Sequence, residues 1–333
     1  MTITPHSAAP PPMFTVIVAV YNAEKYLEET LVSLRRQSFQ DFEVVMIDDG
    51  SRDGSAGVAS RFCALDPRFR LYRTENRGIS PARNLAVAQA HAPWIAVCDA
   101  DDTWDRQKLE LQAHFIRGWN DPGEELVALG TSGHYVNSAG EVTRRIDLEP
   151  RPWPAALRQG SVVGHIAMIN SSVVFRRDAF LAVGEYRAEY TPTEDMDLWV
   201  RLSERGAVLN LPQHLTGYRM HGSNISETAY VVMLLHTRRI IANAARRAKG
   251  LPEWSEPGFM EQLRRDPQHF AATMRNLEQL KYYNMGKSCW QNRRYLRAAG
   301  CILRSALADP WQTLRLLRSS EVYRSSRLVR KAS

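Results

Sequence analysis

The sequence predicts an α/β protein whose mostly parallel central sheet is flanked by helices and followed by a helical C-terminal extension. Short, largely apolar runs at residues 14–20, 42–47 and 94–98 are typical of strands buried on both faces of a parallel sheet, because they carry no polar alternation. Stretches with helical periodicity and short connections separate these runs, which is the pattern of a doubly wound sheet. Beyond residue 230 the composition changes to helix formers, arginine and leucine.

Length and charge set the broad class. The 333 residues exceed the usual size of one domain, and 44% hydrophobic with 24% charged residues is an ordinary globular composition. The formal net charge of +7 is concentrated near the end, where residues 293–333 hold ten lysines and arginines against Asp309 and Glu321. Such a segment suits an anionic membrane face or a polyanionic substrate, although a solvated basic helix is the commoner explanation of a charge run.

Cysteine use and the lack of a targeting signal predict a cytoplasmic protein. The four cysteines form no Cys-x-x-Cys pair and have no histidine at metal-ligand spacing, so neither a zinc site nor a disulfide framework is expected. Residues 1–12 lack the basic and apolar regions of a signal peptide and are expected to form a disordered leader. No apolar run approaches the ~20 residues that cross a bilayer. A peripheral location on the inner face of the cytoplasmic membrane is the alternative to a purely cytoplasmic one.

The elements of the first part follow from local patterns. Leu27, Leu31 and Leu34 are spaced as the buried stripe of a helix. A Ser-Pro pair at residues 80–81 supplies the cap and first residue of another helix. The expected order is strand 14–20, helix 24–37, strand 42–47, helix to 65, strand 70–73, helix to 90 and strand 94–98.

Two of the predicted strands run directly into carboxylates. The first motif is Asp48-Asp49-Gly50-Ser51 and the second is Asp99-Ala100-Asp101-Asp102. Ligands bind at the carboxyl ends of strands in open α/β sheets, and an Asp-x-Asp there offers oxygen ligands to a hard divalent cation. The competing interpretation is that Asp101 or Asp102 only caps a helix at residues 104–116. Two strands ending in acids favour the ligand interpretation.

A third segment points to an anion. Gly78 permits a turn before the helix that begins near residue 80, and Arg83 falls in the first turn of that helix. A guanidinium beside free backbone N–H groups is a suitable partner for a diphosphate. A solvated arginine on a surface helix is nearly as good an explanation of this segment alone.

Together these motifs resemble the ordered signature of the bacterial, non-processive family 2 glycosyltransferases, which have the Rossmann-like GT-A fold. The resemblance covers residues 14–105 and is specific because four motifs occur in order: residues 16–22, 47–51, 76–78 with 82–84, and 99–102. Neither a Walker loop nor a Gly-x-Gly-x-x-Gly motif is present. The Gln-x-x-Arg-Trp motif of processive relatives is also missing. The resemblance implies a GT-A domain at 13–227, with a nucleotide half at 13–105 and an acceptor half at 106–227, followed by a basic helical extension at 228–333.

The resemblance also implies roles for single residues. Asp49 would accept the N3–H of uracil, and Arg83 would lie near the diphosphate. Asp99 and Asp101 would position the ribose and an Mg²⁺ or Mn²⁺ ion. The residues implied in nucleotide-sugar binding are Val20, Tyr21, Asn22, Asp49, Arg83, Asp99, Ala100 and Asp101.

A second acidic cluster, Glu194-Asp195-Met196-Asp197, opens a predicted helix. Acidic residues there are often only partners of the helix dipole. The cluster also looks like the family's Glu-Asp motif, whose aspartate is the general base, which makes Asp195 the candidate base. Glu194, Asp197 and Trp199 are then candidates for orienting it or contacting the acceptor. His221, further along, is a candidate metal or diphosphate ligand or merely a surface residue.

The rest of the chain is less regular. Short strands are predicted at 126–130, 133–136, 141–145, 165–175, 209–212 and 215–220, with a helix at 176–183. Helices are predicted at 228–249, 260–264, 270–290, 295–308 and 311–318. Arginines at 315, 318, 324, 327 and 330 beside apolar residues form a candidate basic surface for a membrane, whereas a partner-binding or core-covering role is equally open.

The sequence thus predicts an inverting, metal-dependent glycosyltransferase that uses Mn²⁺ or Mg²⁺. Its donor is expected to be a UDP-sugar or a dTDP-sugar, and its acceptor a glycan or lipid-linked molecule of surface polysaccharide biosynthesis. No nucleic-acid partner is expected. The alternatives are a sugar nucleotidyltransferase and a catalytically inactive carbohydrate-binding protein of the same fold.

Overall fold

The computed structural model describes residues 10–150, 168–221, 229–291 and 294–319, and the chain divides into two compact units. The first unit comprises residues 1–222 and 240–251, and the second comprises residues 223–239 and 252–333. The expected boundary at residue 227 differs from this division, because the end of α9 (Tyr230–Arg247) belongs to the first unit. Ile240 and Ala244 of that helix pack with Tyr190 and Val200.

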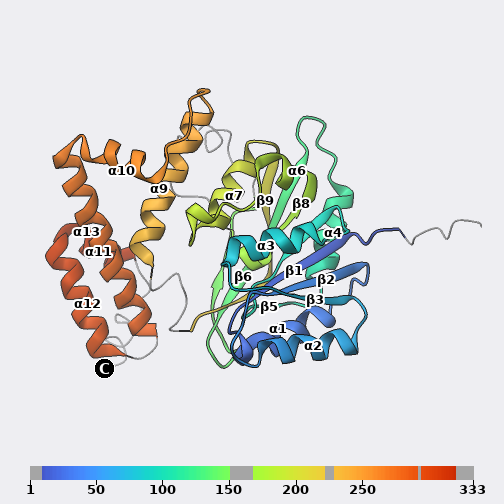
Figure 1. Ribbon diagram of the computed structural model, residues 1–333. Helices are drawn as coiled ribbons and strands as arrows, with labels where there is room; N and C mark the ends of the chain where they lie inside the picture. The colour runs from blue at the N-terminus through green and yellow to red at the C-terminus, as the bar shows by residue number, and fades with distance from the viewer. Residues whose placement is uncertain (1–9, 151–167, 222–228, 292–293, 320–333) are drawn as a thin grey trace, which may run out of the picture. The chain divides into compact units, whose positions relative to one another are not determined.

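The first unit is built on one sheet with the strand order β3-β2-β1-β4-β8-β6-β9-β5, in which β7 pairs with β6 (Figure 1). The described strands are β1 (Phe14–Val20), β2 (Phe42–Asp48), β3 (Phe69–Arg73), β4 (Trp94–Val97), β5 (Thr103–Trp104), β6 (Leu126–Val136), β7 (Val142–Ile146), β8 (Val174–Arg176) and β9 (Ala207–Arg219). Strands β1 to β4 are parallel, as are β6 and β9, whereas β5, β7 and β8 pair antiparallel. The predicted α/β fold class is confirmed.

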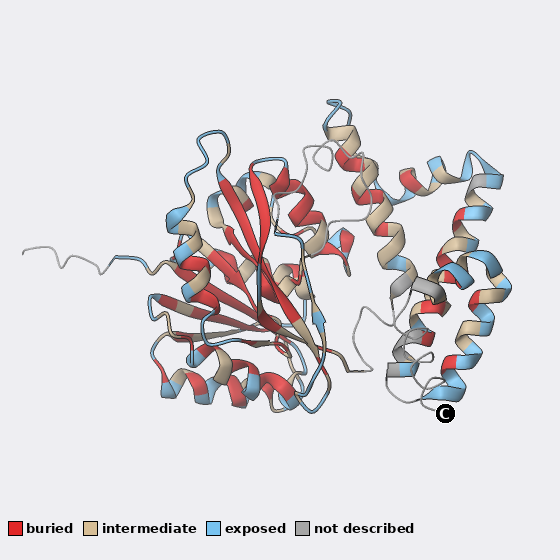
Figure 2. Ribbon diagram, turned by 180° about the vertical axis from the view of Figure 1, so that it is seen from behind, coloured by how far each residue is buried: buried red, intermediate tan, exposed pale blue. Residues whose placement is uncertain are grey.

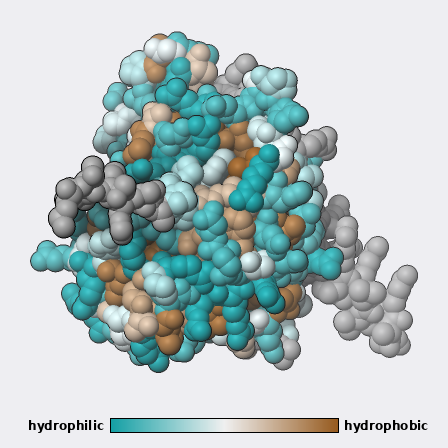
Figure 3. All heavy atoms as spheres, turned by 90° about the vertical axis from the view of Figure 1, so that its right-hand side faces the viewer, coloured by the Kyte–Doolittle hydropathy of each residue, from teal (hydrophilic) through white to brown (hydrophobic). Residues whose placement is uncertain are grey.

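Helices cover both faces of this sheet. Val16 and Val18 pack in the core with α1 (Glu24–Arg35), α2 (Ser55–Leu65) and α4 (Lys108–Gly118). Ile17, one position along, packs in the opposite core with α3 (Ile79–Ala88), α6 (Arg177–Val183) and α7 (Glu194–Ser203). Figure 2 shows the strands as the most continuously buried part of the unit. The face seen in Figure 3 is mainly hydrophilic, with apolar residues in small groups.

Several predicted elements differ in extent. The two strands expected at 126–136 are the single strand β6, and those expected at 209–220 are the single strand β9. Their pairing continues past Gly133, where a Cβ atom would lie 2.4 Å from the Thr216 carbonyl oxygen. In the predicted strand 165–175, residues 165–167 lie outside the described part, and the remainder forms a 3₁₀ turn (Asn170–Ser172) before β8.

The helix expected to begin at residue 104 begins at Lys108 instead. Thr103 and Trp104 form β5 and pair with Gly217 and Thr216 of β9. Pairing with a distant strand therefore overrides the local helical pattern.

The second unit is helical, as expected. Besides the first part of α9, it contains α10 (Glu256–Arg264), α11 (Pro267–Gln291), α12 (Tyr295–Ala308) and α13 (Pro310–Ser319). Leu277 and Ala298 are buried, and Gln279 of α11 donates hydrogen bonds to Ser305 and Thr313. None of the described helices is long and apolar enough to cross a bilayer. The candidate basic residues at 324, 327 and 330 lie outside the described residues.

Candidate active site

The parallel strands bring the predicted site residues to one edge of the sheet. Val20 pairs with Asp48 across β1 and β2, so the two strands end side by side. The chain then turns sharply at Asn22, with a φ of 49°, and at Gly50, with a φ of 75°. A Cβ atom on Gly50 would lie 2.8 Å from the Asn76 backbone nitrogen, so only glycine fits this approach. The end of β2 therefore packs directly against the loop at residues 74–78.

Asp49 organises that loop. Its carboxylate accepts hydrogen bonds from the Arg77 backbone N–H at 2.9 Å, the Gly78 N–H at 2.8 Å and the Thr74 hydroxyl at 3.2 Å. The residue is 4% exposed. A carboxylate has about four lone-pair sites, so these three bonds leave capacity for another donor. Recognition of uracil by Asp49 stays a prediction.

The residues after β1 that are predicted to contact the nucleoside differ in exposure. Tyr21 is 49% exposed, whereas the Val20 side chain is buried in the core. The Val20 carbonyl accepts a hydrogen bond from the Asp49 N–H at 2.9 Å. The Asn22 side chain accepts a hydrogen bond from the Arg52 backbone N–H, also at 2.9 Å, and so braces the two turns. Tyr21 and Asn22 are therefore the exposed residues of this turn.

The acidic turn after β4 separates its carboxylates. Asp101 Oδ2 lies 2.8 Å from His221 Nε2, and the imidazole of His221 stacks on Tyr26 with centroids 5.0 Å apart. The structure thus joins two of the three predicted metal ligands. Burial and the charge of Asp99 raise the pKa of Asp101, while His221 opposes this effect. The Ala100 carbonyl accepts a hydrogen bond from Thr30, so Ala100 contributes to the turn itself.

Asp102, the third acid, points inward and is 1% exposed. It accepts a short hydrogen bond from the Ser171 hydroxyl and another, at 2.8 Å, from the Arg219 backbone N–H. Burial, together with the charges of Asp101 and Asp99, raises its pKa well above the usual value. Asp102 is therefore a buried brace that ties β9 to the turn, and it caps no helix.

Arg83 joins the two halves of the site. Its guanidinium donates to Asp99 Oδ1 and to Glu194 Oε1, both at 2.7 Å, and the residue is 5% exposed. Burial opposes the charged form, yet these two carboxylates raise the pKa of Arg83 above its usual value. The side chain is a permanent cation between the acidic turn and the start of α7. Its predicted contact with a diphosphate stays a prediction.

The first turn of α7 carries the candidate base. Asp195 is half-buried beside Glu194, and its Oδ1 accepts a hydrogen bond from the Met196 N–H at 2.7 Å. Burial and the Glu194 carboxylate raise the pKa of Asp195 to about 7, although Arg83 acts in the opposite direction. A general base works best when its pKa lies near the operating pH. The environment of Asp195 is therefore suited to proton transfer.

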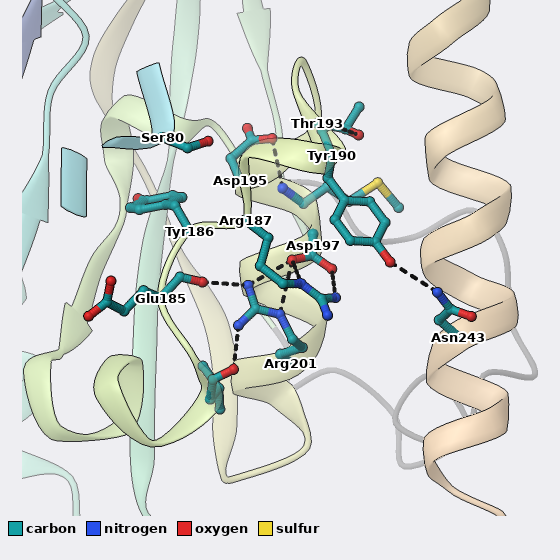
Figure 4. A network of polar contacts seen from close by, with 12 residues as sticks. Ser80, Glu185, Tyr186, Arg187, Tyr190, Thr193, Asp195, Asp197, Arg201 and Asn243 are labelled. Carbon is teal, nitrogen blue, oxygen red and sulfur yellow. Dashed lines mark hydrogen bonds and ion pairs between the residues drawn. The ribbon is translucent and has the colours of Figure 1, made fainter. Parts of the chain in front are cut away.

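Asp197 and Trp199 are placed inside the protein. Figure 4 shows the Asp197 carboxylate between Arg187 and Arg201, whose Nε atoms donate to Asp197 Oδ2 at 2.9 Å each. Asp197 thereby anchors α7 and holds the turn that carries Asp195. Trp199 is 2% exposed and packs against Phe175, which leaves no surface for the acceptor contact that the sequence suggested.

Two further residues of the site, Asn170 and Tyr186, were not predicted from the sequence. The Asn170 amide donates to both Asp99 oxygens at 3.0 Å, and the Tyr186 ring lies 5.4 Å from the Arg83 guanidinium carbon. Within the described part of the chain, Asn170 Oδ1, Tyr186 Oη and Glu194 Oε2 are buried without a hydrogen-bond partner. Buried polar atoms normally find partners, so these three are available to a ligand. The only hint in the sequence is the polar Asn-Ser-Ser interruption of an apolar run.

The α/β sheet, the acidic turn after β4 and the Glu194-Asp195 turn define a glycosyltransferase of the GT-A fold. The family model described as Glycosyl transferase family 2 matches residues 15–181, half of the chain. The chain belongs to this family of glycosyltransferases.

Curated relatives are bacterial. TuaG of Bacillus subtilis, a glycosyltransferase provisionally assigned to teichuronic acid biosynthesis, is 37% identical over 106 residues, 32% of this chain and 42% of TuaG. An uncharacterized glycosyltransferase of Rickettsia conorii is 24% identical over 72% of this chain and 38% of its own length. EpsE of Bacillus subtilis is 27% identical over 66% of this chain and 73% of EpsE. This chain thus spans about two fifths of the first two relatives.

Solved structures share the fold at low sequence identity. TarS 1–349 of S. aureus superposes with a TM-score of 0.53 and 18% identity, covering 88% of this chain and 90% of TarS 1–349. The mannosyltransferase PcManGT of Pyrobaculum calidifontis, in complex with GDP-Man and Mn²⁺, superposes with a TM-score of 0.53 and 19% identity. The match covers 96% of this chain and 84% of PcManGT. At these identities the likeness shows the fold alone.

Proposed function

We propose that the chain is an inverting, metal-dependent glycosyltransferase that transfers a single hexose or hexosamine from a nucleotide sugar to a glycan or lipid-linked acceptor. The observation that carries the proposal is the Arg83 bridge. One guanidinium holds Asp99 of the acidic turn and Glu194 beside Asp195, each at 2.7 Å. A donor-side carboxylate and a candidate base are thereby held around one point, as attack on an anomeric carbon requires.

The proposed nucleoside contacts are Tyr21, Asn22 and Asp49. A carboxylate accepts a hydrogen bond from N3–H of uracil or thymine, and cytosine lacks that donor. We therefore propose a UDP-sugar as donor, with a dTDP-sugar as the alternative. TarS 1–349 has been solved with UDP-GlcNAc and PcManGT with GDP-Man, which supports a nucleotide-sugar site without choosing the base.

The proposed metal ligands are Asp101, Asp99 and His221. Among the described residues no group of three or more acidic, histidine or cysteine side chains is arranged to hold an ion alone. Diphosphate oxygens would complete the shell, because Mg²⁺ is usually bound by one or two carboxylates plus substrate phosphates. Burial and then the charge of Asp99 raise the pKa of Asp101, and a cation here would offset the repulsion between the two carboxylates. When bound, the ion stabilises charge on the leaving diphosphate, and the Mn²⁺ in PcManGT supports this role.

Asp195 is the proposed general base. With a pKa of about 7, roughly half of its carboxylates are ionised at neutral pH. The ionised form accepts the proton of the acceptor hydroxyl as that oxygen attacks the anomeric carbon opposite the leaving diphosphate, which inverts the configuration. Arg83 keeps its charge throughout and holds Glu194 away from this proton transfer.

The proposed context is surface polysaccharide biosynthesis at the inner face of the cytoplasmic membrane. The name of TuaG refers to teichuronic acid biosynthesis, and this relative matches the chain over 106 residues. The C-terminal charge of the chain is compatible with such a location.

Thermal unfolding with UDP, dTDP, CDP and GDP, each with and without Mn²⁺, tests the proposal. A ligand at about 100 times its dissociation constant stabilises by about 2.7 kcal/mol, a rise of several degrees. We expect UDP to stabilise the wild type in the presence of Mn²⁺. The Asp101→Asn variant should lose this stabilisation. The control variant Asp41→Asn, at an exposed aspartate before β2, should retain it. No response to any nucleotide would favour the carbohydrate-binding alternative. Pyrophosphate release from UTP and a sugar 1-phosphate would favour the nucleotidyltransferase.

A further inference from the structure

Helices α12 and α13 of the second unit expose an apolar face. Leu296, Leu303 and Leu307 of α12 are 92%, 62% and 77% exposed, and Trp311 and Leu314 of α13 are 83% and 47% exposed. The three α12 leucines are seven and four residues apart, so at about 3.6 residues per turn they form one row along the helix. These five residues are called the α12–α13 face. Exposed apolar side chains gathered in a row are a feature of surfaces that bind a partner or a membrane.

A pocket continues this face into the helical unit. It has a volume of about 440 Å³ and lies between α11, α12 and α13. Its lining is apolar or aromatic and includes Tyr283, Trp290, Ile302, Leu303 and Leu317. Leu303 belongs both to the exposed row and to the pocket wall, so the two are one continuous apolar surface.

Positive charge flanks the face. Arg297 and Arg304 follow Leu296 and Leu303 by one residue and are exposed, as is Arg315 on α13. Between residues 294 and 319 the sequence has five arginines and one acid, Asp309. A second copy of this chain would bring the same charge against itself, which disfavours self-association. An anionic surface with an apolar interior satisfies both features.

We propose that the α12–α13 face docks on the surface of an anionic lipid bilayer. The leucines and Trp311 enter the boundary between headgroups and acyl chains, the arginines contact lipid phosphates, and the pocket accepts an acyl chain. Apolar area and basic charge are the two signals that together give stable peripheral binding. Tryptophan is enriched at this depth of a bilayer. If the acceptor is lipid-linked, as in the proposed function, docking brings the chain to it; the observations on the α12–α13 face themselves do not depend on the transfer reaction.

Cosedimentation of the full chain with vesicles tests the proposal. We expect at least tenfold tighter binding to equimolar phosphatidylglycerol and phosphatidylcholine than to phosphatidylcholine alone, weakening with salt. The double variant Leu303→Gln/Leu307→Gln should lose at least tenfold in affinity. Leu65→Gln, at a leucine equally 62% exposed on α2 of the first unit, is the matched control and should bind like the wild type.

The charge is tested in the same way. Arg297→Gln/Arg304→Gln should abolish the preference for anionic vesicles, whereas Arg265→Gln, whose side chain is 69% exposed on the same unit, should keep it. Equal binding to both vesicles, or unchanged binding by the leucine double variant, would overturn the proposal. So would a dimer in solution that this variant dissociates, with no vesicle binding by the wild type. Nucleotide-dependent thermal stabilisation of the same variants checks that they are folded. It also tests the proposed transferase separately, because a variant can lose vesicle binding and still bind the nucleotide.

Discussion

The sheet edge of the first unit buries charged residues, whereas the α12–α13 face of the second unit exposes large apolar residues. At the sheet edge, Asp49, Arg83 and Asp102 are at most 5% exposed. On the α12–α13 face, Leu296 and Leu307 are at least 77% exposed. Charged groups are normally outside and large aliphatic groups inside, so both regions depart from the common pattern.

The two departures have different consequences. Every buried charge named above has partners within the first unit, and Arg83 and Asp102 each tie together segments that are distant in the chain. The exposed leucines are left uncovered by the described part of the second unit. Buried charge therefore indicates internal preorganisation for chemistry, whereas exposed apolar area indicates an external surface. Changes in the two regions should accordingly differ in what they affect.

The largest expected effect is on activity, through Asp195. Asp195→Asn removes the proposed base while keeping its size, so we expect kcat to fall at least about 1,000-fold. The KM for the donor should change little, because the proposed nucleotide contacts lie elsewhere. Steady-state UDP release measures both constants, and Asp41→Asn serves as the control. Undiminished transfer by Asp195→Asn would show that another group takes the proton.

The acidic ends of the strands were predictable from sequence because each signal is local. The apolar runs at residues 44–47 and 94–98 lead directly into Asp48 and Asp99. The prediction of a helix from residue 104 was wrong at its start, because β5 pairs with β9, more than 100 residues away in the sequence. Propensity carries no information about such distant pairing.

The connections within the site were not predictable in this way. Arg83 meets Glu194 across 111 residues of sequence, and Asp102 meets the Arg219 backbone across 117. Nothing local distinguishes Arg83 from an arginine on a solvated helix. In the second unit the sequence predicted the helices, but periodicity does not show which apolar face is covered. The basic surface was accordingly sought between residues 315 and 330, whereas the exposed leucine row lies on α12.

The second largest effect is on stability, through Arg219. Its fully buried guanidinium donates to the Asp101 carbonyl at 2.7 Å, the Asn137 carbonyl at 3.1 Å and Glu29 at 2.6 Å. Arg219→Met should lower the free energy of unfolding by about 3 kcal/mol, because the Asp101 and Asn137 carbonyls and Glu29 all lose their donor. Glu29→Gln, at a half-exposed partner, should cost less than about 1 kcal/mol. Urea denaturation measures the change in the free energy of unfolding for both variants. Equal changes would contradict a stabilising role of the Arg219 hydrogen bonds to the Asp101 and Asn137 carbonyls.

The third effect is the dependence of stability on pH. The folded state raises the pKa of Asp195 from 3.8 to about 7. Its protonated form is therefore favoured by folding, and this contribution is lost as pH rises from about 4 towards 7. Asp195→Asn, which stays neutral, should gain stability relative to the wild type by about 1 to 3 kcal/mol between pH 5 and pH 8.

Paired denaturation curves at the two pH values measure this difference, in which other titrating groups cancel. Asp41→Asn, measured in the same way, is the control substitution. A difference that does not change with pH would contradict the raised pKa and weaken the assignment of Asp195 as base.

The smallest effect is expected on the α12–α13 face. Leu307 is 77% exposed, so Leu307→Gln removes little buried apolar area and should change the free energy of unfolding by less than about 0.5 kcal/mol. Leu277 in the same unit is 1% exposed, and Leu277→Ala should cost about 2 to 5 kcal/mol by leaving a cavity. Thermal unfolding of both variants in detergent-free buffer measures the contrast. A loss of more than about 2 kcal/mol in Leu307→Gln would mean that this leucine is covered within the protein, and the outward-facing surface would then be withdrawn.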